Sequence, residues 1–243
     1  MITVQNLSVS VNNTVLLKNI SLEIPAGKLI ALVGPNGAGK TSLMKTLIGL
    51  HDFEGTIKIN SVPLDAVDPE HRAKKIAYMP QGTTIHWPMT VENIVALGRY
   101  PHGMTEQKDK SIITDALETV GITALKDRIV TTLSGGERAL TLLARTLATK
   151  ADCLLIDEPT ASLDPRHQLD VMAVFRRLTD QGKTIIVILH DLHLAQRFAD
   201  RLILLDQGRL ISSGPASKAL SAHNLKQVYG LIEGTDGFEA VDS

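Results

Sequence analysis

The sequence predicts an α/β fold with a parallel sheet at its core, an antiparallel side sheet and an inserted helical region. Leu29–Val33 is a continuous apolar run that precedes a glycine-rich loop and a segment with helical periodicity. Two further apolar runs, Cys153–Ile156 and Thr184–Leu189, flank a helical pattern over Pro165–Thr179. Strands that alternate with helices form parallel sheets, and parallel strands are buried on both faces, so they are apolar throughout. These observations place the chain in the α/β class.

The glycine-rich loop after the first apolar run matches G-x-x-x-x-G-K-[ST] at every fixed position. Its glycines let successive backbone N–H groups curl around an anion without Cβ clashes. Lys40 is placed to reach the β- and γ-phosphates of a nucleotide, and the Thr41 hydroxyl to ligate Mg²⁺. The strand before the loop and the helix after it are the setting that this motif requires, so we expect a nucleotide site and not a ligand-free turn. The loop residues are Gly34, Pro35, Asn36, Gly37, Ala38, Gly39, Lys40 and Thr41.

Composition narrows the class of protein. Of the 243 residues, 44% are hydrophobic and 21% charged, which is ordinary for a globular domain, and the net charge of −1 gives no basic field for nucleic acid. No apolar run is long enough to span a membrane, and the N-terminus has no signal-peptide pattern. Cys153, the one cysteine, rules out an internal disulfide and suits a small core position. We therefore expect a cytoplasmic protein.

Short strands precede and follow the core pattern. Ile2–Val11, a turn at Asn12-Asn13 and Val15–Ile24 predict one hairpin, and Thr56–Ile59 followed by Val62–Leu64 predicts another. We expect these antiparallel pieces to form a side sheet near the glycine-rich loop. Near the C-terminus the sequence predicts a strand at 202–206, a hairpin partner at 209–213, a short helix after Ser221 and a frayed end.

Helical periodicity dominates the middle of the chain. It predicts helices over Val91–Arg99, with Thr90 as N-cap, over Glu106–Val120 and over Gly135–Thr149. We expect a single domain over residues 1–233. Its core and antiparallel parts are predicted at 1–81 and 151–233, its helical subdomain at about 82–150, and a tail at 234–243.

Two carboxylates follow the apolar run that begins at Cys153. Ligands in open α/β sheets sit at the carboxyl ends of strands, so Asp157 is a candidate for holding Mg²⁺ through water. Glu158 points to the opposite side and is a candidate for polarising an attacking water. A pair of acidic residues in a surface turn is the alternative, and the upstream phosphate loop favours the functional interpretation.

A second candidate anion site precedes the helix predicted at Gly135–Thr149. Ser134 is a good N-cap, and Gly135 and Gly136 expose backbone N–H groups at the positive end of that helix. The alternative is that these residues only cap the helix and bind no anion. His190 ends the last apolar run, where a histidine can hydrogen-bond a γ-phosphate or the attacking water. His190 and His193 lie three residues apart, but no third ligand at a suitable spacing supports a metal site.

Together these motifs resemble the ATP-binding subunit of ABC transporters over nearly the whole chain. The motifs occur in the order of that family: Walker A at Gly34–Thr41, the Q-loop at Gln81, the signature at Leu133–Glu137, Walker B at Cys153–Glu158, the D-loop at Ser162–Asp164 and the switch histidine at His190.

The resemblance implies ATP hydrolysis with Mg²⁺ by two subunits paired head to tail. Each ATP then lies between the P-loop of one chain and Ser134-Gly135-Gly136 of the other. The resemblance makes Glu158 the general base, while Gln81 senses Mg²⁺ and the attacking water and relays to the membrane partner. The catalytic residues that it implies are Glu158, His190, Gln81 and Lys40. The residues that it implies contact the nucleotide are Gly34–Ser42, Ser134, Gly135, Gly136, Glu137 and Asp164. The Mg²⁺ ligands that it implies are Thr41, Gln81 and Asp157.

The sequence departs from the family pattern in two places. The aromatic residue that usually stacks on adenine aligns with Val11. Base stacking on an aromatic ring is worth about 1–3 kcal/mol, so without a substitute ATP should bind roughly ten- to a hundredfold more weakly. In the signature helix, Ala139-Leu140-Thr141 replaces the usual Gln-Arg continuation. These positions lie beyond the phosphate-contacting turn, so we expect altered helix packing and intact catalysis.

The resemblance is more specific around Val95–His102, which looks like the importer branch for iron-siderophore, haem and cobalamin uptake. Pro88–Asn93 is also found in manganese and zinc importers. The resemblance implies a separate integral-membrane permease that docks after the Q-loop, a substrate-binding protein, and a peripheral location on the cytoplasmic face of the cell (inner) membrane.

We interpret His102 as a histidine at a helix end whose hydrogen bonds are satisfied within the chain. The alternatives are an importer of manganese or zinc and a soluble ABC ATPase in iron–sulfur cluster assembly. A non-hydrolysing nucleotide sensor is disfavoured because Glu158 and His190 are both present. The cargo, the permease and the ATP stoichiometry do not follow from the sequence.

Overall fold

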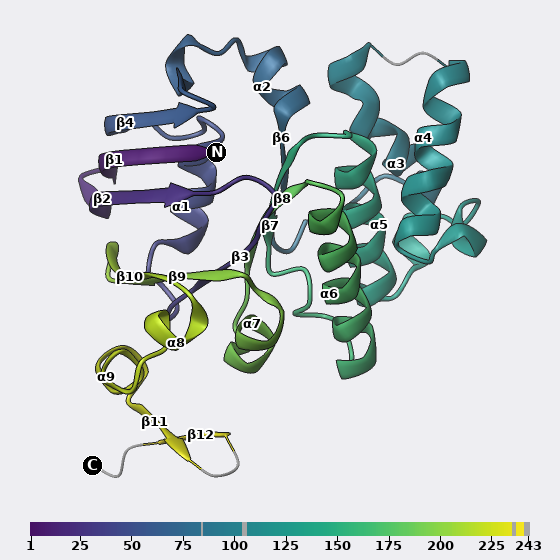
Figure 1. Cartoon of the computed structure of the whole chain (residues 1–243). Helices are drawn as coiled ribbons and strands as arrows, with labels where there is room; N and C mark the ends of the chain where they lie inside the picture. Colours follow the sequence, from purple (N-terminus) through teal and green to yellow (C-terminus); the bar gives the residue numbers. More distant parts are fainter. Residues whose placement is uncertain (84, 104–105, 235–236, 241–243) are drawn as a thin grey trace. The chain divides into compact units, whose positions relative to one another are not determined.

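The computed structural model describes residues 1–83, 85–103, 106–234 and 237–240 (Figure 1). The chain divides into two compact units, which are described separately below. Unit 1 comprises residues 1–67 and 188–243, and unit 2 comprises residues 68–187. The phosphate loop belongs to unit 1, whereas the region predicted as a helical subdomain lies inside unit 2. Within the described residues, no helix combines the length and apolarity needed to cross a bilayer.

Unit 1 contains the predicted antiparallel sheet, with strand order β2-β1-β4-β5. β1 (Ile2–Val11) pairs with β2 (Thr14–Ile24) and with β4 (Glu54–Ile59), which in turn pairs with β5 (Val62–Pro63). Both predicted hairpins are thus confirmed. Asn12-Asn13 and Asn60-Ser61 adopt positive φ at their turns, as tight two-residue hairpin turns require.

The strand that leads into the phosphate loop lies in a second sheet of unit 1. β3 (Leu29–Val33) is parallel to β9 (Arg201–Asp206), which is antiparallel to β10 (Arg209–Gly214). Every residue of β3 is buried, as its apolar run predicts. α1 (Lys40–Leu47) follows the loop, where the sequence predicts a helix. α7 (Leu192–Phe198), a helix that the periodicity did not indicate, completes this part.

The C-terminal part of unit 1 is more ordered than the sequence predicted. After α8 (Ala216–Ala219), α9 (Ala222–Asn224) continues into η5, a single π-helical turn over Leu225–Tyr229. β11 (Leu231–Gly234) and β12 (Gly237–Ala240) then pair as an antiparallel hairpin. The prediction of a frayed end from Gly234 was therefore wrong for 237–240. The prediction rested on the general tendency of chain ends to be poorly ordered, whereas here pairing between two short strands satisfies the backbone.

Unit 2 contains strands in the order β8-β7-β6. β7 (Cys153–Asp157) is parallel to β6 (Ile76–Met79), and β8 (Thr184–Ile188) ends at the boundary with unit 1. α6 (Pro165–Asp180) lies between β7 and β8 in the chain, as predicted. β6 and the preceding α2 (Pro69–Lys75) were not predicted. β6 is short, and its apolar run is interrupted by Tyr78.

The helices of unit 2 enclose a separate apolar core (Figure 1). α4 (Glu106–Thr119) and α5 (Gly135–Ala148) match their predicted ranges to within one residue, with 3₁₀ turns η3 (Thr123–Leu125) and η4 (Val130–Thr132) between them. The helix predicted over Val91–Arg99 instead ends at Ala96 as α3 (Val91–Ala96) and continues as a 3₁₀ turn, η2 (Leu97–His102). Pro101 explains the change, because its ring clashes with the carbonyl of residue i−4 in an α-helix.

Candidate functional site

The phosphate loop in unit 1 has a backbone that only glycine permits at two positions. Gly34 has φ +148°, and a Cβ there would lie 2.1 Å from the Leu205 carbonyl oxygen. Gly39 has φ +98°, and its Cβ would lie 2.8 Å from Leu17 Cδ2. Lys40 is buried and donates from Nζ to the carbonyls of Gly34 at 2.7 Å and Pro35 at 2.9 Å. The loop thus curls around a positive charge, as an anion cradle requires.

The turn between β9 and β10 supports the loop from outside. The Gly208 N–H donates to the Ala38 carbonyl at 3.1 Å, and the Lys18 N–H donates to the Gly208 carbonyl at 2.7 Å. A Cβ at Gly208 would lie 2.5 Å from the Leu16 carbonyl oxygen. From the sequence we predicted only a hairpin here, between 202–206 and 209–213. Its role against the loop depends on the pairing of β3 with β9, for which the sequence carries no local signal.

His190 is exposed and lies beside the strand that feeds the phosphate loop. The neighbouring Leu189 N–H donates to the Leu32 carbonyl at 3.3 Å, which ties the end of this segment to β3. Asp191 then caps α7, accepting through Oδ1 from the N–H groups of His193 and Leu194. His190 is therefore held between a strand and a capped helix. His193 stacks on Phe238, and the described residues contain no cluster of three or more His, Cys, Asp or Glu that suits a metal.

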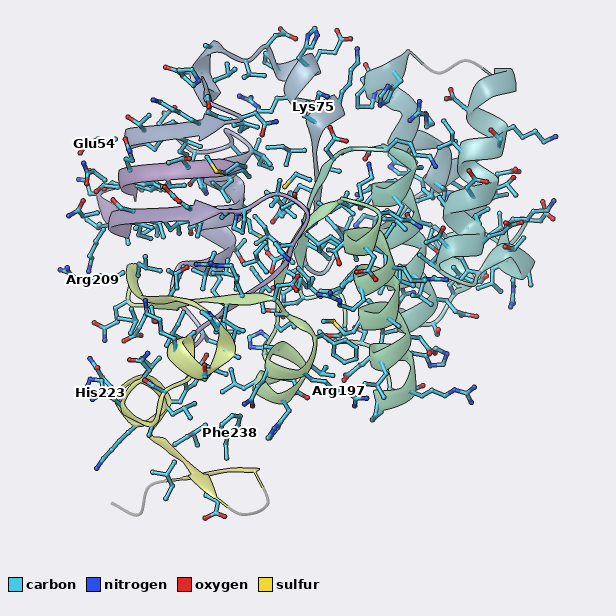
Figure 2. All side chains as sticks on the ribbon, viewed as in Figure 1. Glu54, Lys75, Arg197, Arg209, His223 and Phe238 are labelled. Atoms are coloured by element: carbon cyan, nitrogen blue, oxygen red, sulfur yellow. The ribbon has the colours of Figure 1, made fainter. Side chains whose placement is uncertain are left out.

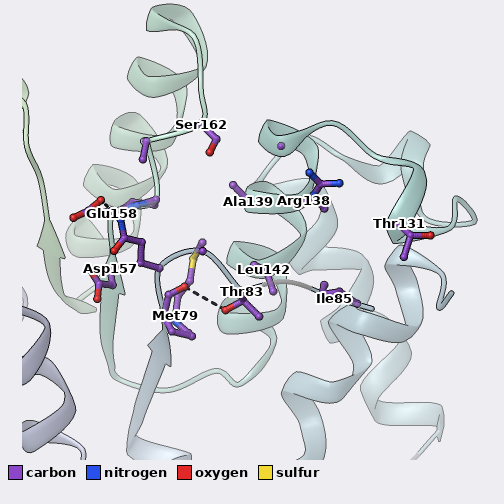
Figure 3. A pocket seen from close by; sticks show the side chains of 16 residues that line it. Met79, Thr83, Ile85, Thr131, Arg138, Ala139, Leu142, Asp157, Glu158 and Ser162 are labelled. Atoms are coloured by element: carbon purple, nitrogen blue, oxygen red, sulfur yellow. Dashed lines mark hydrogen bonds between the residues drawn. The ribbon is translucent and has the colours of Figure 1, made fainter. Parts of the chain in front are cut away.

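Unit 2 contains a cavity of about 410 Å³ between the Q-loop, the start of α5 and the end of β7 (Figure 3). Gln81 donates from Nε2 to the carboxylate of Glu158. Asp157 is buried, and the Tyr78 hydroxyl donates to its Oδ2 at 3.3 Å. Burial, reinforced by the charge of Asp157, raises the pKa of Tyr78, so its hydroxyl stays protonated as a donor. The structure therefore brings together the Q-loop glutamine and both carboxylates.

Glu158 has an uncommon backbone conformation, with φ +50°. Such left-handed geometry is rare for residues other than glycine and asparagine, and it costs of order 1 kcal/mol or more. The turn redirects the chain at the end of β7, and the Glu158 carboxylate lies on the cavity wall with Gln81 (Figure 3). Strain of this kind at a strand end is a recurrent feature of functional sites.

The signature turn begins α5 with a complete capping box. The Ser134 hydroxyl accepts from the Glu137 N–H at 3.2 Å, and the Glu137 carboxylate accepts from the Ser134 N–H at 2.8 Å. The Ser134 N–H holds the pKa of Glu137 below its ordinary value. A Cβ on Gly136 would come within 3.0 Å of Leu163 in the D-loop, so the two segments lie side by side.

Asp164, the last residue of the D-loop, caps α6. It accepts from the His167 N–H at 3.0 Å and contacts the His167 ring at 2.7 Å. The backbone N–H of His167 is the main cause of a lowered pKa at Asp164. In this chain Asp164 therefore fixes the direction in which α6 leaves the D-loop.

The predicted site residues thus form two groups. Unit 1 contains Gly34–Ser42 and His190; unit 2 contains Gln81, Ser134–Glu137, Asp157, Glu158 and Asp164. Two residues that support these groups were not predicted from the sequence: Tyr78, which donates to Asp157, and Gly208, which donates to Ala38. Cys153 is buried, and His102 Nε2 lies 2.9 Å from the Thr149 carbonyl oxygen, as expected for a satisfied helix-end histidine. Val11 is 37% exposed at the tip of the first hairpin.

A strand, a glycine-cradled lysine and a helix, together with acidic residues at the end of a second buried strand, define a P-loop nucleoside triphosphatase. Comparison with known proteins narrows the class. The ABC transporter family profile matches residues 17–161, so the chain belongs to the ABC transporter family, as an ATP-binding subunit with ATPase activity.

Individual relatives match this chain in sequence over most of their own length. The hemin import ATP-binding protein HmuV of Pseudomonas putida is 38% identical, over 95% of this chain and 93% of its own. HmuV of Thermobifida fusca is 39% identical, over 93% of this chain and 80% of its own. Among solved structures, cbiO1 of Clostridium perfringens, part of the ABC transporter complex cbiONQ, superposes with a TM-score of 0.80 at 25% identity, covering 93% of this chain and 92% of that one.

Proposed function

We propose that this chain is the ATP-hydrolysing subunit of an importer that brings an iron chelate, with haem as the first candidate, through a separate membrane permease. The observation that carries the proposal is the match to hemin import ATP-binding proteins over more than nine-tenths of the chain. Siderophores and cobalamin are the other cargoes of the same branch. The chain then works as a peripheral subunit on the cytoplasmic face of the membrane, while a substrate-binding protein selects the cargo.

The proposed roles are those that the family resemblance assigns to these residues. Lys40 and the backbone of Gly34–Ser42 bind the triphosphate, and Thr41, Gln81 and Asp157 supply oxygen ligands, which suit Mg²⁺. Bound Mg²⁺ would neutralise developing phosphate charge. Glu158 takes the proton of the attacking water while Gln81 holds its carboxylate, and His190 acts on the same water or the γ-phosphate.

A second copy of the chain completes the proposed site. Ser134, Gly135, Gly136 and Glu137 lie at the positive end of α5, which favours an anion. In a head-to-tail dimer this turn meets the nucleotide on the P-loop of the partner, and Asp164 joins the two sites. The arrangement explains why one chain has two candidate phosphate sites.

Transport with a defined cargo tests the proposal. The chain is co-expressed with its permease and binding protein, reconstituted in vesicles, and supplied with haem, a ferric siderophore or cobalamin. We expect uptake of haem that depends on internal ATP and is absent with Glu158→Gln. Uptake of manganese or zinc in place of all three, or a chain that purifies only with soluble partners, would contradict the proposal.

A further inference from the structure

Another cavity of unit 2 lies among α4, α5 and α6, the helices labelled in Figure 1, whose side chains Figure 2 shows. Its volume is about 680 Å³, and it shares no lining residue with the cavity beside Glu158. Small organic molecules bind in protein cavities of about 300–1,000 Å³. The cavity is therefore large enough for such a molecule, and the roles proposed above for ATP hydrolysis leave it unassigned.

The walls of this cavity are mostly apolar. Leu140 lines it and is half-buried. This leucine belongs to Ala139-Leu140-Thr141, the stretch that replaces the usual Gln-Arg continuation of the signature, so an apolar side chain lies where the family pattern has polar ones. The apolar group of a ligand would be removed from water here, which is favourable. The main apolar side chains come from α5, from α6 and from the connection after α4: Leu140, Leu143, Val171, Val174, Ile122 and Leu125.

The rim of the cavity carries three carboxylates, one from each helix. They belong to Glu118 on α4, Glu137 on α5 and Asp170 on α6. Glu137 accepts from the Ser134 N–H and completes the capping box of α5. Glu118 and Asp170 are exposed, and within the described residues neither carboxylate forms a hydrogen bond or an ion pair. Two of the three carboxylates are therefore available to a ligand.

The two basic side chains of the rim are already engaged within the chain. Arg177 Nη2 donates to the Thr119 carbonyl at 3.3 Å. The His167 ring contacts the Asp164 carboxylate at 2.7 Å. Three carboxylates against one guanidinium leave the rim negative while the His167 ring is neutral. The charge of the rim therefore favours a cation and disfavours an anion.

We propose that this cavity binds a small organic cation, in which an apolar body carries an amine. The apolar body packs against the walls at Leu140 and Val174, and the ammonium lies at the rim with Glu118 and Asp170. Burial of the body supplies most of the affinity, while the rim selects the charge. The inference goes beyond the proposed function and does not rest on it, because it uses only residues of unit 2 and needs no nucleotide.

Three probes with one apolar body test the charge preference. The full chain, without nucleotide, is titrated with 4-phenylbutylamine, 4-phenylbutanol or 4-phenylbutyrate, and binding is measured by saturation-transfer NMR. We expect the amine to bind with a Kd of about 1 mM, as ligand efficiencies predict for a molecule of this size. The amine should bind at least about fivefold more tightly than the carboxylate, with the alcohol between them.

Matched variants test whether the amine binds in this cavity. Glu118→Gln combined with Asp170→Asn removes two charges and keeps the shapes, so it should weaken amine binding about fivefold and leave the alcohol within about twofold. Asp180→Asn is the control: Asp180 is exposed and lies about 15 Å further along α6, so this change should leave all three probes unaffected. Leu140→Arg places a cation on the apolar wall and should weaken amine binding at least about tenfold.

The opposite outcomes overturn the inference. Equal affinity for the amine and the carboxylate would show that the rim does not select a cation. Amine binding that neither the double variant nor Leu140→Arg weakens would place the amine elsewhere on the chain. If none of the three probes binds, the cavity is not a small-molecule site. A basic amphipathic peptide that binds when the probes do not would assign the cavity to a protein partner and likewise overturn the proposal.

Discussion

Replacing Arg99 with alanine should destabilise unit 2 strongly, although Arg99 belongs to Val95–His102, the stretch whose resemblance indicates the importer branch. Arg99 Nε donates to Asp109 Oδ1 at 2.7 Å, and the two side chains are only 8% and 10% exposed. Arg99 Nη1 also donates to the Ala148 carbonyl at 2.8 Å, at the C-terminal end of α5. The guanidinium therefore ties η2 to both α4 and α5.

The expected magnitude follows from burial. Removing one partner of a buried ion pair costs about 3–5 kcal/mol, because the remaining charge stays desolvated. A surface pair would cost about 1 kcal/mol or less. Natural domains are stable by about 5–15 kcal/mol, so Arg99→Ala should remove a large share of the stability of unit 2. Replacing both partners by apolar residues, as in Arg99→Met with Asp109→Leu, should recover much of the loss.

Urea unfolding followed by circular dichroism measures the effect. With a slope of about 2 kcal/mol per molar urea, a loss of about 4 kcal/mol lowers the midpoint of the affected transition by about 2 M. Lys74→Ala, which breaks the exposed pair with Glu70, is the control and should shift the midpoint by less than about 0.5 M. A shift as small for Arg99→Ala, or a double variant no more stable than Arg99→Ala, would refute the reasoning.

Two further substitutions and one labelling experiment test other parts of the account. Val11→Tyr should tighten ATP binding about tenfold by adding a ring at the hairpin tip; an unchanged dissociation constant would mean that another residue holds adenine. Ser134→Arg should abolish hydrolysis while the isolated chain still binds ATP, and full activity would exclude a two-chain site. Burial raises the pKa of the Cys153 thiol to about 12, so at pH 8 only about one thiol in ten thousand is ionised. Iodoacetamide should therefore label the chain only after unfolding, and rapid labelling of native protein would show that Cys153 is not buried.

The elements that the sequence predicted well are those with a complete local signal. β3 matches its apolar run at both ends, and α4 and α5 match their periodicity to within a residue. β6 was missed because a short strand interrupted by a polar aromatic residue has no distinctive period. The end of α3 was misjudged because the effect of Pro101 extends several residues upstream of the proline itself.

The residues of the candidate site divide in the same way, into those with a local signal in the sequence and those without one. Residues inside contiguous motifs, such as Lys40 and Glu158, could be named as candidates from their place in those motifs. Tyr78 and Gly208 could not, because each contacts a motif far away in the chain: Tyr78 contacts Asp157 through the pairing of β6 with β7, and Gly208 contacts Ala38. No periodicity in a single sequence encodes such contacts. Arg99 shows the converse, since a motif recognised by resemblance has a buried structural side chain at its centre.

The measurement that tests the central claim most directly combines gel filtration and ATP turnover of Glu158→Gln. If Glu158 is the general base of a site shared by two chains, the variant should form a dimer in Mg-ATP and hydrolyse at least about a hundredfold more slowly than the native chain, because general-base catalysis contributes about 10²–10⁴-fold. A variant that turns over ATP at nearly the native rate, or that stays monomeric in saturating ATP, would contradict the account.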